Sequence, residues 1–105
     1  MTKIKVPPHV TIGAHTYSIS LDSSLRDENN RGAANHRTLA IDIAPERPPS
    51  QKLEILMHEI LHAINVIWLE RELEEGEIGH LSEGLAQALM SFDIQLDWSG
   101  IPFKR

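Results

Sequence analysis

Hydrophobic and polar residues alternate with a period of two in the first half of the chain, as they do in half-buried β-strands. The alternation covers residues 9–12 and 16–21, which a Gly-Ala turn separates, and it returns in residues 38–43 (TLAIDI). We therefore expect about three strands, and TLAIDI is a candidate for an edge strand. Residues 22–36 contain DENNRGAAN and few hydrophobic side chains, which predicts a mobile loop.

The period changes to that of an α-helix after the proline-rich stretch APERPPS. Pro48 and Pro49 can neither continue a strand nor sit inside a helix, and Ser50 is a good N-cap residue. The sequence QKLEILMHEILHAINVIW then predicts a helix from about residue 51 to about residue 68. Its hydrophobic side chains cover most of its circumference, so we expect other parts of the protein to cover most of it as well.

A second helix is predicted over residues 75–92, because hydrophobic residues recur there at spacings of three and four. They are Ile78, Leu81, Leu85, Ala88 and Phe92. Gly84 inside this helix costs about 1 kcal/mol relative to alanine, which suggests close packing against the neighbouring helix. Residues 97–105 (DWSGIPFKR) show no period and are expected to form a tail.

A chain of 105 residues fits one domain over residues 1–105. We divide it into a β-sheet region (1–45), a first helix (50–69), a second helix (75–92) and a C-terminal tail (97–105).

The net charge is −5 and no basic stripe is present, which argues against nucleic acid as a partner. No apolar run approaches the roughly 18 residues that a membrane span needs, and the N-terminus MTKIKVPP lacks the hydrophobic region of a signal peptide. We therefore expect a cytoplasmic protein without a membrane partner. Cysteine is absent, so any bound metal must be held by histidine and carboxylate ligands.

The first helix contains an HExxH motif within MHEILHA, residues 57–63. His58 and His62 lie one turn apart, about 40° from each other around the helix, and their rings should face covered protein, with the second helix as the expected neighbour. Two histidines at this spacing can bind one zinc ion. Glu59 lies one step round the helix, where it can take a proton from a zinc-bound water and pass it to the leaving amine. The motif therefore predicts a zinc hydrolase site.

A third ligand is needed, because zinc hydrolases use three protein ligands and a water. The downstream candidates are Glu70, Glu72, Glu74, Glu75, Glu77, His80 and Glu83. Glu83 lies on the far side of the second helix and is excluded, whereas Glu75 and Glu77 each lie one turn before a hydrophobic residue of its stripe. His80 borders the stripe, as a ligand or as a donor to the transition state. No such pattern surrounds the remaining histidines, which we expect to be ordinary surface or strand residues: His9, His15 and His36.

LMHEILHAI followed by EEGEIGHLSEGLAQAL resembles the small phage- and mobile-element-encoded metallopeptidases of the ImmA/IrrE type. They belong to the gluzincins, whose very short members are the minigluzincins, and the resemblance covers about residues 17–89. In that family a glutamate opens the second helix three residues before an aliphatic residue, here Ile78, so the matching position is Glu75. Relatives often carry a second acidic residue next, where this chain has Gly76. Glu77 therefore stays open as an alternative ligand.

The resemblance implies an α+β fold in which a small antiparallel sheet of about three strands backs the active-site helix, and a glutamate helix closes the zinc site. It implies a zinc-dependent endopeptidase with His58, His62 and Glu75 as ligands and Glu59 as general base. It also implies that an extended peptide pairs with an edge strand, for which TLAIDI is the candidate. The expected substrate is a cytoplasmic regulatory or phage-related protein.

Two other interpretations stay open. The chain can be a catalytically inactive, zinc-stabilised interaction or adaptor protein of a phage or prophage, or a metal-free domain that pairs its exposed strand with a partner. The tail likewise allows two expectations. It can fold over the cleft and keep the enzyme latent, or it can cap the core through Trp98, Ile101 and Phe103.

Overall fold

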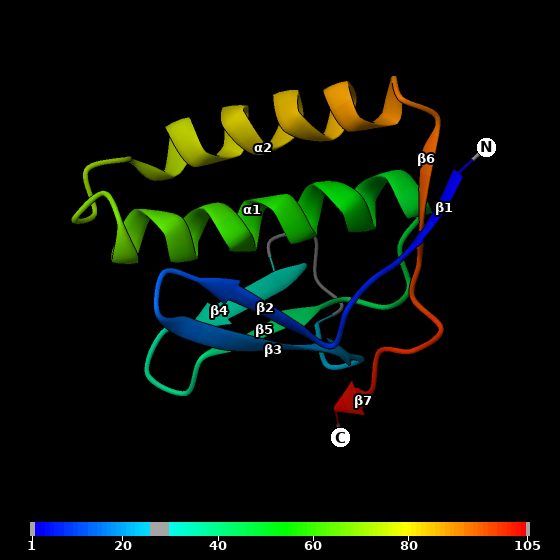
Figure 1. Ribbon diagram of the computed structural model, residues 1–105, viewed down its shortest axis with the longest axis horizontal. Coiled ribbons are helices and arrows are strands. Elements are labelled where there is room, and N and C mark those ends of the chain that lie inside the picture. Colours follow the sequence, from blue (N-terminus) through cyan, green and yellow to red (C-terminus); the bar gives the residue numbers. More distant parts are fainter. Residues whose placement is uncertain (1, 26–29, 105) are drawn as a thin grey trace.

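The computed structural model describes residues 2–25 and 30–104, which form three layers (Figure 1). Helix α2 (Glu75–Met90) lies on helix α1 (Pro49–Ile67), and α1 lies on a five-stranded sheet. The strands of this sheet are β2 (His9–Ile12), β3 (His15–Asp22), β4 (Gly32–Asn35), β5 (Ala40–Ile43) and β7 (Phe103–Lys104). A separate parallel pair at one side of the molecule is made by β1 (Thr2–Lys5) and β6 (Ile94–Asp97). The expected α+β class is therefore confirmed.

The five-stranded sheet is mixed, so the expectation of an antiparallel sheet of about three strands is wrong in strand number and direction. Its order is β2-β3-β5-β4, with β7 paired to the end of β3. Strand β3 runs antiparallel to β2 but parallel to β5, and β4 runs antiparallel to β5. The strands missed by the sequence pattern are short: β4 reads GAAN and β7 reads FK. Neither sequence contains a hydrophobic alternation long enough to predict a strand.

Strand β5 lies inside the sheet. Its Ile41 pairs with Ile19 of β3 on one side and with Ala34 of β4 on the other. The expectation that TLAIDI forms an edge strand is therefore wrong, and β4 is the edge strand at this end. Because β4 occupies residues 32–35, the prediction of a loop over residues 22–36 is wrong for that part, while residues 26–29 lie outside the described residues.

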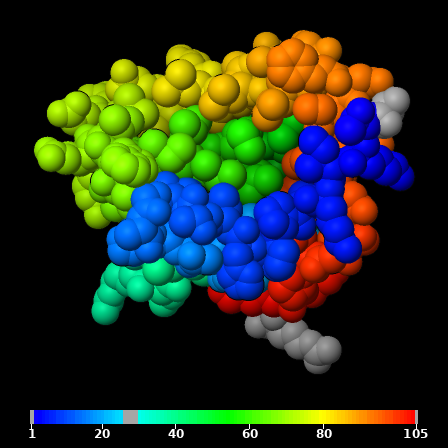
Figure 2. Space-filling model, in the orientation of Figure 1, coloured from blue at the N-terminus to red at the C-terminus, as the bar shows by residue number. Residues whose placement is uncertain are grey.

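The hydrophobic core lies between one face of the sheet and α1. Most of its buried members come from alternate positions of β3 and β5 and from one side of α1: Tyr17, Ile19, Leu21, Ile41, Ile43, Ile55, Leu56 and Ala63. In the space-filling view, α1 is visible between α2 and the strands β2 and β3 (Figure 2). Burying each large apolar side chain stabilises the fold by about 1.5–3 kcal/mol, so this core fixes which side of α1 faces away from the sheet.

Both helices begin close to where the sequence predicts them. Helix α1 begins at Pro49 with Pro48 as N-cap and without a side-chain cap, so the expected N-cap role of Ser50 is wrong. Proline suits the first helical position because its missing N–H would have no partner there. Helix α2 begins at Glu75 and ends at Met90. Glu74 is its N-cap.

The tail and Gly84 differ from the expectations in part. The expectation that the tail caps the core is confirmed for Trp98 and Ile101, which are buried there. It is wrong for Phe103, which is exposed. A Cβ atom added at Gly84 would meet nothing within 4 Å, so the expected close packing of this glycine is wrong. Within residues 2–25 and 30–104, no helix is long and apolar enough to cross a membrane.

Candidate metal centre

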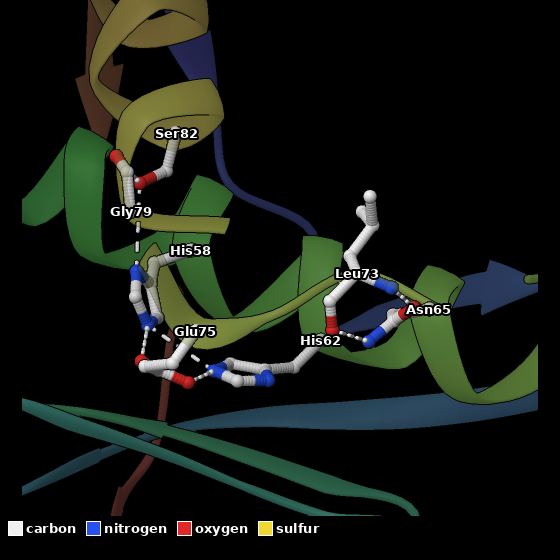
Figure 3. A network of polar contacts seen from close by, with 7 residues as sticks. All are labelled: His58, His62, Asn65, Leu73, Glu75, Gly79 and Ser82. Carbon is white, nitrogen blue, oxygen red and sulfur yellow. Dashed lines mark hydrogen bonds and ion pairs between the residues drawn. The ribbon is translucent and has the colours of Figure 1, made fainter. Parts of the chain in front are cut away.

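His58 and His62 turn their Nε2 atoms toward each other on the side of α1 that faces α2 (Figure 3). The two Nε2 atoms lie 3.2 Å apart, and the ring centroids are 4.8 Å apart. The i, i+4 spacing places both side chains on one side of the helix. Both rings are about one quarter exposed, because they line an open cavity rather than the core.

Glu75 reaches both histidines from the first position of α2. Its Oε1 lies 3.0 Å from Nε2 of His58, and its Oε2 lies 3.1 Å from Nε2 of His62. Ligands bound tetrahedrally at about 2.0–2.2 Å from one zinc ion lie roughly 3.3–3.6 Å apart. The three side chains therefore have the donor types and nearly the mutual spacing of a zinc site. Within the described part of the chain, these three residues form the group of His and acidic side chains able to hold a metal ion.

Ser82 of α2 lies beside Nδ1, the other ring nitrogen of His58. Its hydroxyl donates to the carbonyl oxygen of Gly79 at 2.9 Å, and its Oγ lies 3.4 Å from Nδ1 of His58. Because the hydroxyl proton is donated to Gly79, Ser82 is placed to accept a hydrogen bond from the tautomer of His58 that carries a proton on Nδ1. In that tautomer of the neutral ring, Nε2 would present a lone pair toward Glu75 and His62. Acceptors that face one another in this way are stabilised by a cation between them, either a proton or a metal ion.

Glu59 lines the same cavity but is not one of the three converging residues. The cavity has a volume of about 350 Å³ and is lined by Arg31, Gly32, Glu54, Ile55, His58, Glu59, His62 and Glu75. Glu59 is only 7% exposed. Burial, and secondarily the negative charge of Glu75, raise the pKa of Glu59 to about 7. A carboxylate with such a pKa can accept and return a proton near neutral pH.

The edge strand β4 passes directly beside Glu59. A Cβ atom added at Gly32 would lie 2.6 Å from Cγ2 of Ile55 and 2.9 Å from Oε2 of Glu59. Glycine is therefore required here for the backbone of β4 to approach the carboxylate. No local sequence pattern singles out this glycine, because its neighbours in the fold belong to a helix that begins 17 residues later.

Glu77 and His80, the alternatives to Glu75 as third ligand or as donor to the transition state, lie outside the cavity lining. Glu77 occupies the third position of α2, and its Oε1 accepts a hydrogen bond of 2.9 Å from the backbone N–H of Glu74. This capping box uses the Glu77 carboxylate to satisfy the start of the helix. His80 is exposed on α2. Of the downstream candidates in the described chain, the structure brings Glu75 to the histidines.

The structure also places residues near the site that the sequence did not single out. His36 lies in the turn between β4 and β5, and its Nδ1 is 3.0 Å from the hydroxyl of the buried Tyr17. Burial, and secondarily the charges of Arg71 and His62, lower the pKa of His36. The sequence around His36 contains no pattern that predicts its contact with the hydroxyl of Tyr17.

The tail does not enter the cavity. No residue of the described part of the tail, 97–104, is among the cavity-lining residues. Trp98 and Ile101 pack into the core, and β7 pairs with the end of β3. The expectation of a latency segment over the cleft therefore has no support from the described tail.

Comparisons with protein-family models, with curated proteins and with solved structures found no match.

Proposed function

We propose that this protein is a zinc-dependent endopeptidase in which His58, His62 and Glu75 bind zinc and Glu59 is the general base. The observation that carries the proposal is the convergence of three donors, 3.0–3.2 Å apart, beside a buried carboxylate in one open cavity. A structural site would bind zinc with four protein ligands, whereas three ligands leave a position for water or substrate.

The protein groups divide the chemistry between them. Zinc, when bound, would lower the pKa of a water molecule and polarise the scissile carbonyl. Glu59 takes the proton of the attacking water and later gives it to the leaving amine. In the metal-free protein, burial raises the pKa of Glu59 to about 7. Ser82 holds His58 in the orientation that a ligand needs.

The proposed substrate is a protein segment in extended conformation. It would pair with the free edge of β4, rather than with TLAIDI, because β5 already has partners on both sides. The close approach of Gly32 to Glu59 supports this route, since a peptide paired with β4 would run past the general base. The identity of the substrate as a cytoplasmic regulatory or phage-related protein rests on the resemblance to ImmA/IrrE-type peptidases alone.

A second candidate function is a catalytically inactive, zinc-stabilised interaction or adaptor protein. It is favoured by the exposed hydrophobic side chains of Leu81 and Leu85 on α2 and of Phe92 just after it. Exposed apolar groups that lie close together are typical of protein-binding surfaces. Both functions use the same zinc ligands, so they differ in whether Glu59 performs a reaction.

The deciding experiment combines zinc content with peptide cleavage. Zinc-loaded wild type should retain about one zinc per chain and cleave members of a peptide library. His62→Ala should lose zinc, whereas Glu59→Gln should retain zinc and lose cleavage. Glu54→Gln is the matched control, because it removes another carboxylate from the same cavity. Zinc without cleavage by wild type would favour the adaptor, and failure to bind zinc would contradict both functions and favour a metal-free binding domain.

A further inference from the structure

Asn65 is a buried polar residue on the helix side that carries the candidate ligands. It lies three residues after His62 in α1 and is only 6% exposed (Figure 3). A buried amide must find hydrogen-bond partners, because leaving it unsatisfied costs about 1–3 kcal/mol. Its partners therefore indicate why an asparagine occupies this position.

Both polar atoms of the Asn65 side chain bind the backbone of Leu73. Its Nδ2 donates to the carbonyl oxygen of Leu73 at 3.1 Å, and its Oδ1 accepts from the N–H of Leu73 at 3.0 Å. The backbone carbonyl of Asn65 also accepts a hydrogen bond of 2.8 Å from the N–H of Arg71. These three bonds tie the connection between α1 and α2 to the last turns of α1.

The connection needs such a tie because its backbone is not in a relaxed conformation. Glu70 and Arg71 have φ angles of 51° and 64°, in the left-handed region. For residues other than glycine, this conformation costs roughly 1–2 kcal/mol each. Hydrogen bonds to Asn65 offset part of this cost and favour this path of the chain over others.

The tie matters for Glu75, which follows Leu73 by two residues. The Glu75 side chain is 71% exposed, so packing of the side chain itself cannot hold its carboxylate in place. The position of the Glu75 carboxylate depends instead on where α2 begins. Leu73 is followed by the N-cap residue Glu74, and α2 begins at Glu75. Asn65 therefore fixes the backbone from which the candidate third ligand projects.

We propose that Asn65 is a positioning residue for the metal centre: it holds Leu73 so that Glu75 meets His58 and His62. This inference rests on the proposed zinc function, and it makes the affinity for zinc depend on a residue that does not touch the ion. The same side of α1 thus carries two ligands and the clamp for the third.

The test is a double-mutant cycle read as zinc affinity, measured by competition with a chromophoric chelator. Asn65→Ala should weaken zinc binding about 10- to 100-fold, the usual effect of removing a group that orients a ligand. In a Glu75→Ala background the same substitution should change affinity less than about 3-fold, because no carboxylate is left to position. The Co²⁺ form of Asn65→Ala should show the weakened visible absorption of the Co²⁺ form of Glu75→Ala.

Leu56→Ala is the control for lost stability, because Leu56 is buried in the same helix and packs in the core rather than on the connection. It should leave zinc affinity unchanged while the protein is folded. If Asn65→Ala does not fold, Asn65→Asp replaces it, since it keeps the acceptor for Leu73 N–H and loses the donor to Leu73 C=O. Equal losses of affinity in both backgrounds would overturn this inference alone. Wild type that binds no zinc would overturn the proposed function as well.

Discussion

The backbone at Gly32 and the carboxylate of Glu59 lie so close that a single added carbon would come within 2.9 Å of Oε2 of Glu59. An edge strand and a buried acid are thereby held side by side, with no side chain between them. A substrate paired with β4 would be presented to Glu59 by this contact.

Gly32→Ala should reduce peptide cleavage while zinc remains bound. The added methyl group must displace Glu59 or Ile55, and a shift of about 1 Å in a catalytic group can cost on the order of 100-fold in rate. Measured kcat/KM and zinc content test this, with Ala33→Ser on the exposed position of the same strand as control. Unchanged cleavage by Gly32→Ala would mean that Glu59 does not need its present position.

Ser82→Ala should lower zinc affinity by roughly 10- to 100-fold, because His58 loses the acceptor for its Nδ1–H. Ser91→Ala is a close control. The Ser91 hydroxyl also donates to a helix carbonyl, that of Gln87 at 3.0 Å, but it lies outside the lining of the cavity that contains His58. Chelator competition compares the two variants, and equal affinities would contradict the role given to Ser82.

Glu59 should make the metal-free protein less stable as the pH rises. Its pKa is raised from 4.5 to about 7 in the folded state, so between these values the unfolded chain binds fewer protons than the folded one. The free energy of unfolding therefore falls by an amount on the order of 3 kcal/mol between about pH 4.5 and about pH 7. Above pH 7 this contribution stays constant.

Glu59→Gln removes this titration, so its stability relative to wild type should rise over the same interval. Urea unfolding in the presence of a chelator, at pH 4.5 and pH 8, measures the difference. Glu54→Gln controls for loss of a carboxylate from the cavity. Parallel pH profiles of wild type and Glu59→Gln would show that Glu59 ionises normally when buried.

Trp98→Ala should destabilise the protein by about 3–5 kcal/mol and leave the rate of cleavage per folded molecule unchanged, because Trp98 fills the core and lies outside the cavity lining. Phe103→Ala, at an exposed position, should cost much less. Chemical denaturation and cleavage rates measure both effects. A rise in cleavage per folded molecule would instead support the latent state that the tail sequence also allowed.

The helices and strands β2 and β3 could be predicted from the sequence because their signals are local. The 3.6-residue period and the HExxH spacing lie within one continuous segment, and so does the alternation that forms β2 and β3. The resemblance to ImmA/IrrE-type peptidases predicted Glu75 as the third ligand. The structure adds why Glu77 is placed differently: its carboxylate caps the start of α2. The roles of these residues in catalysis stay predictions.

What the sequence could not predict depends on contacts between distant segments. Strand β4 has the sequence GAAN, and it becomes a strand because β5 offers it backbone partners. The place of β5 inside the sheet follows from that pairing. The contact between Asn65 and Leu73 could not be predicted either, because an asparagine side chain that binds a loop backbone leaves no periodic pattern in the sequence.

Helix α2 buries just Ile78, Ser82 and Ala86 along its 16 residues. These side chains are buried along the length of α2, which packs on α1, and the Leu73 clamp and Glu75 hold the N-terminal end of α2 in addition. An ion shared by Glu75, His58 and His62 would act as a cross-link between the two helices, much as a disulfide does. A bound metal ion would then hold α2 to α1 as well as provide a place for chemistry.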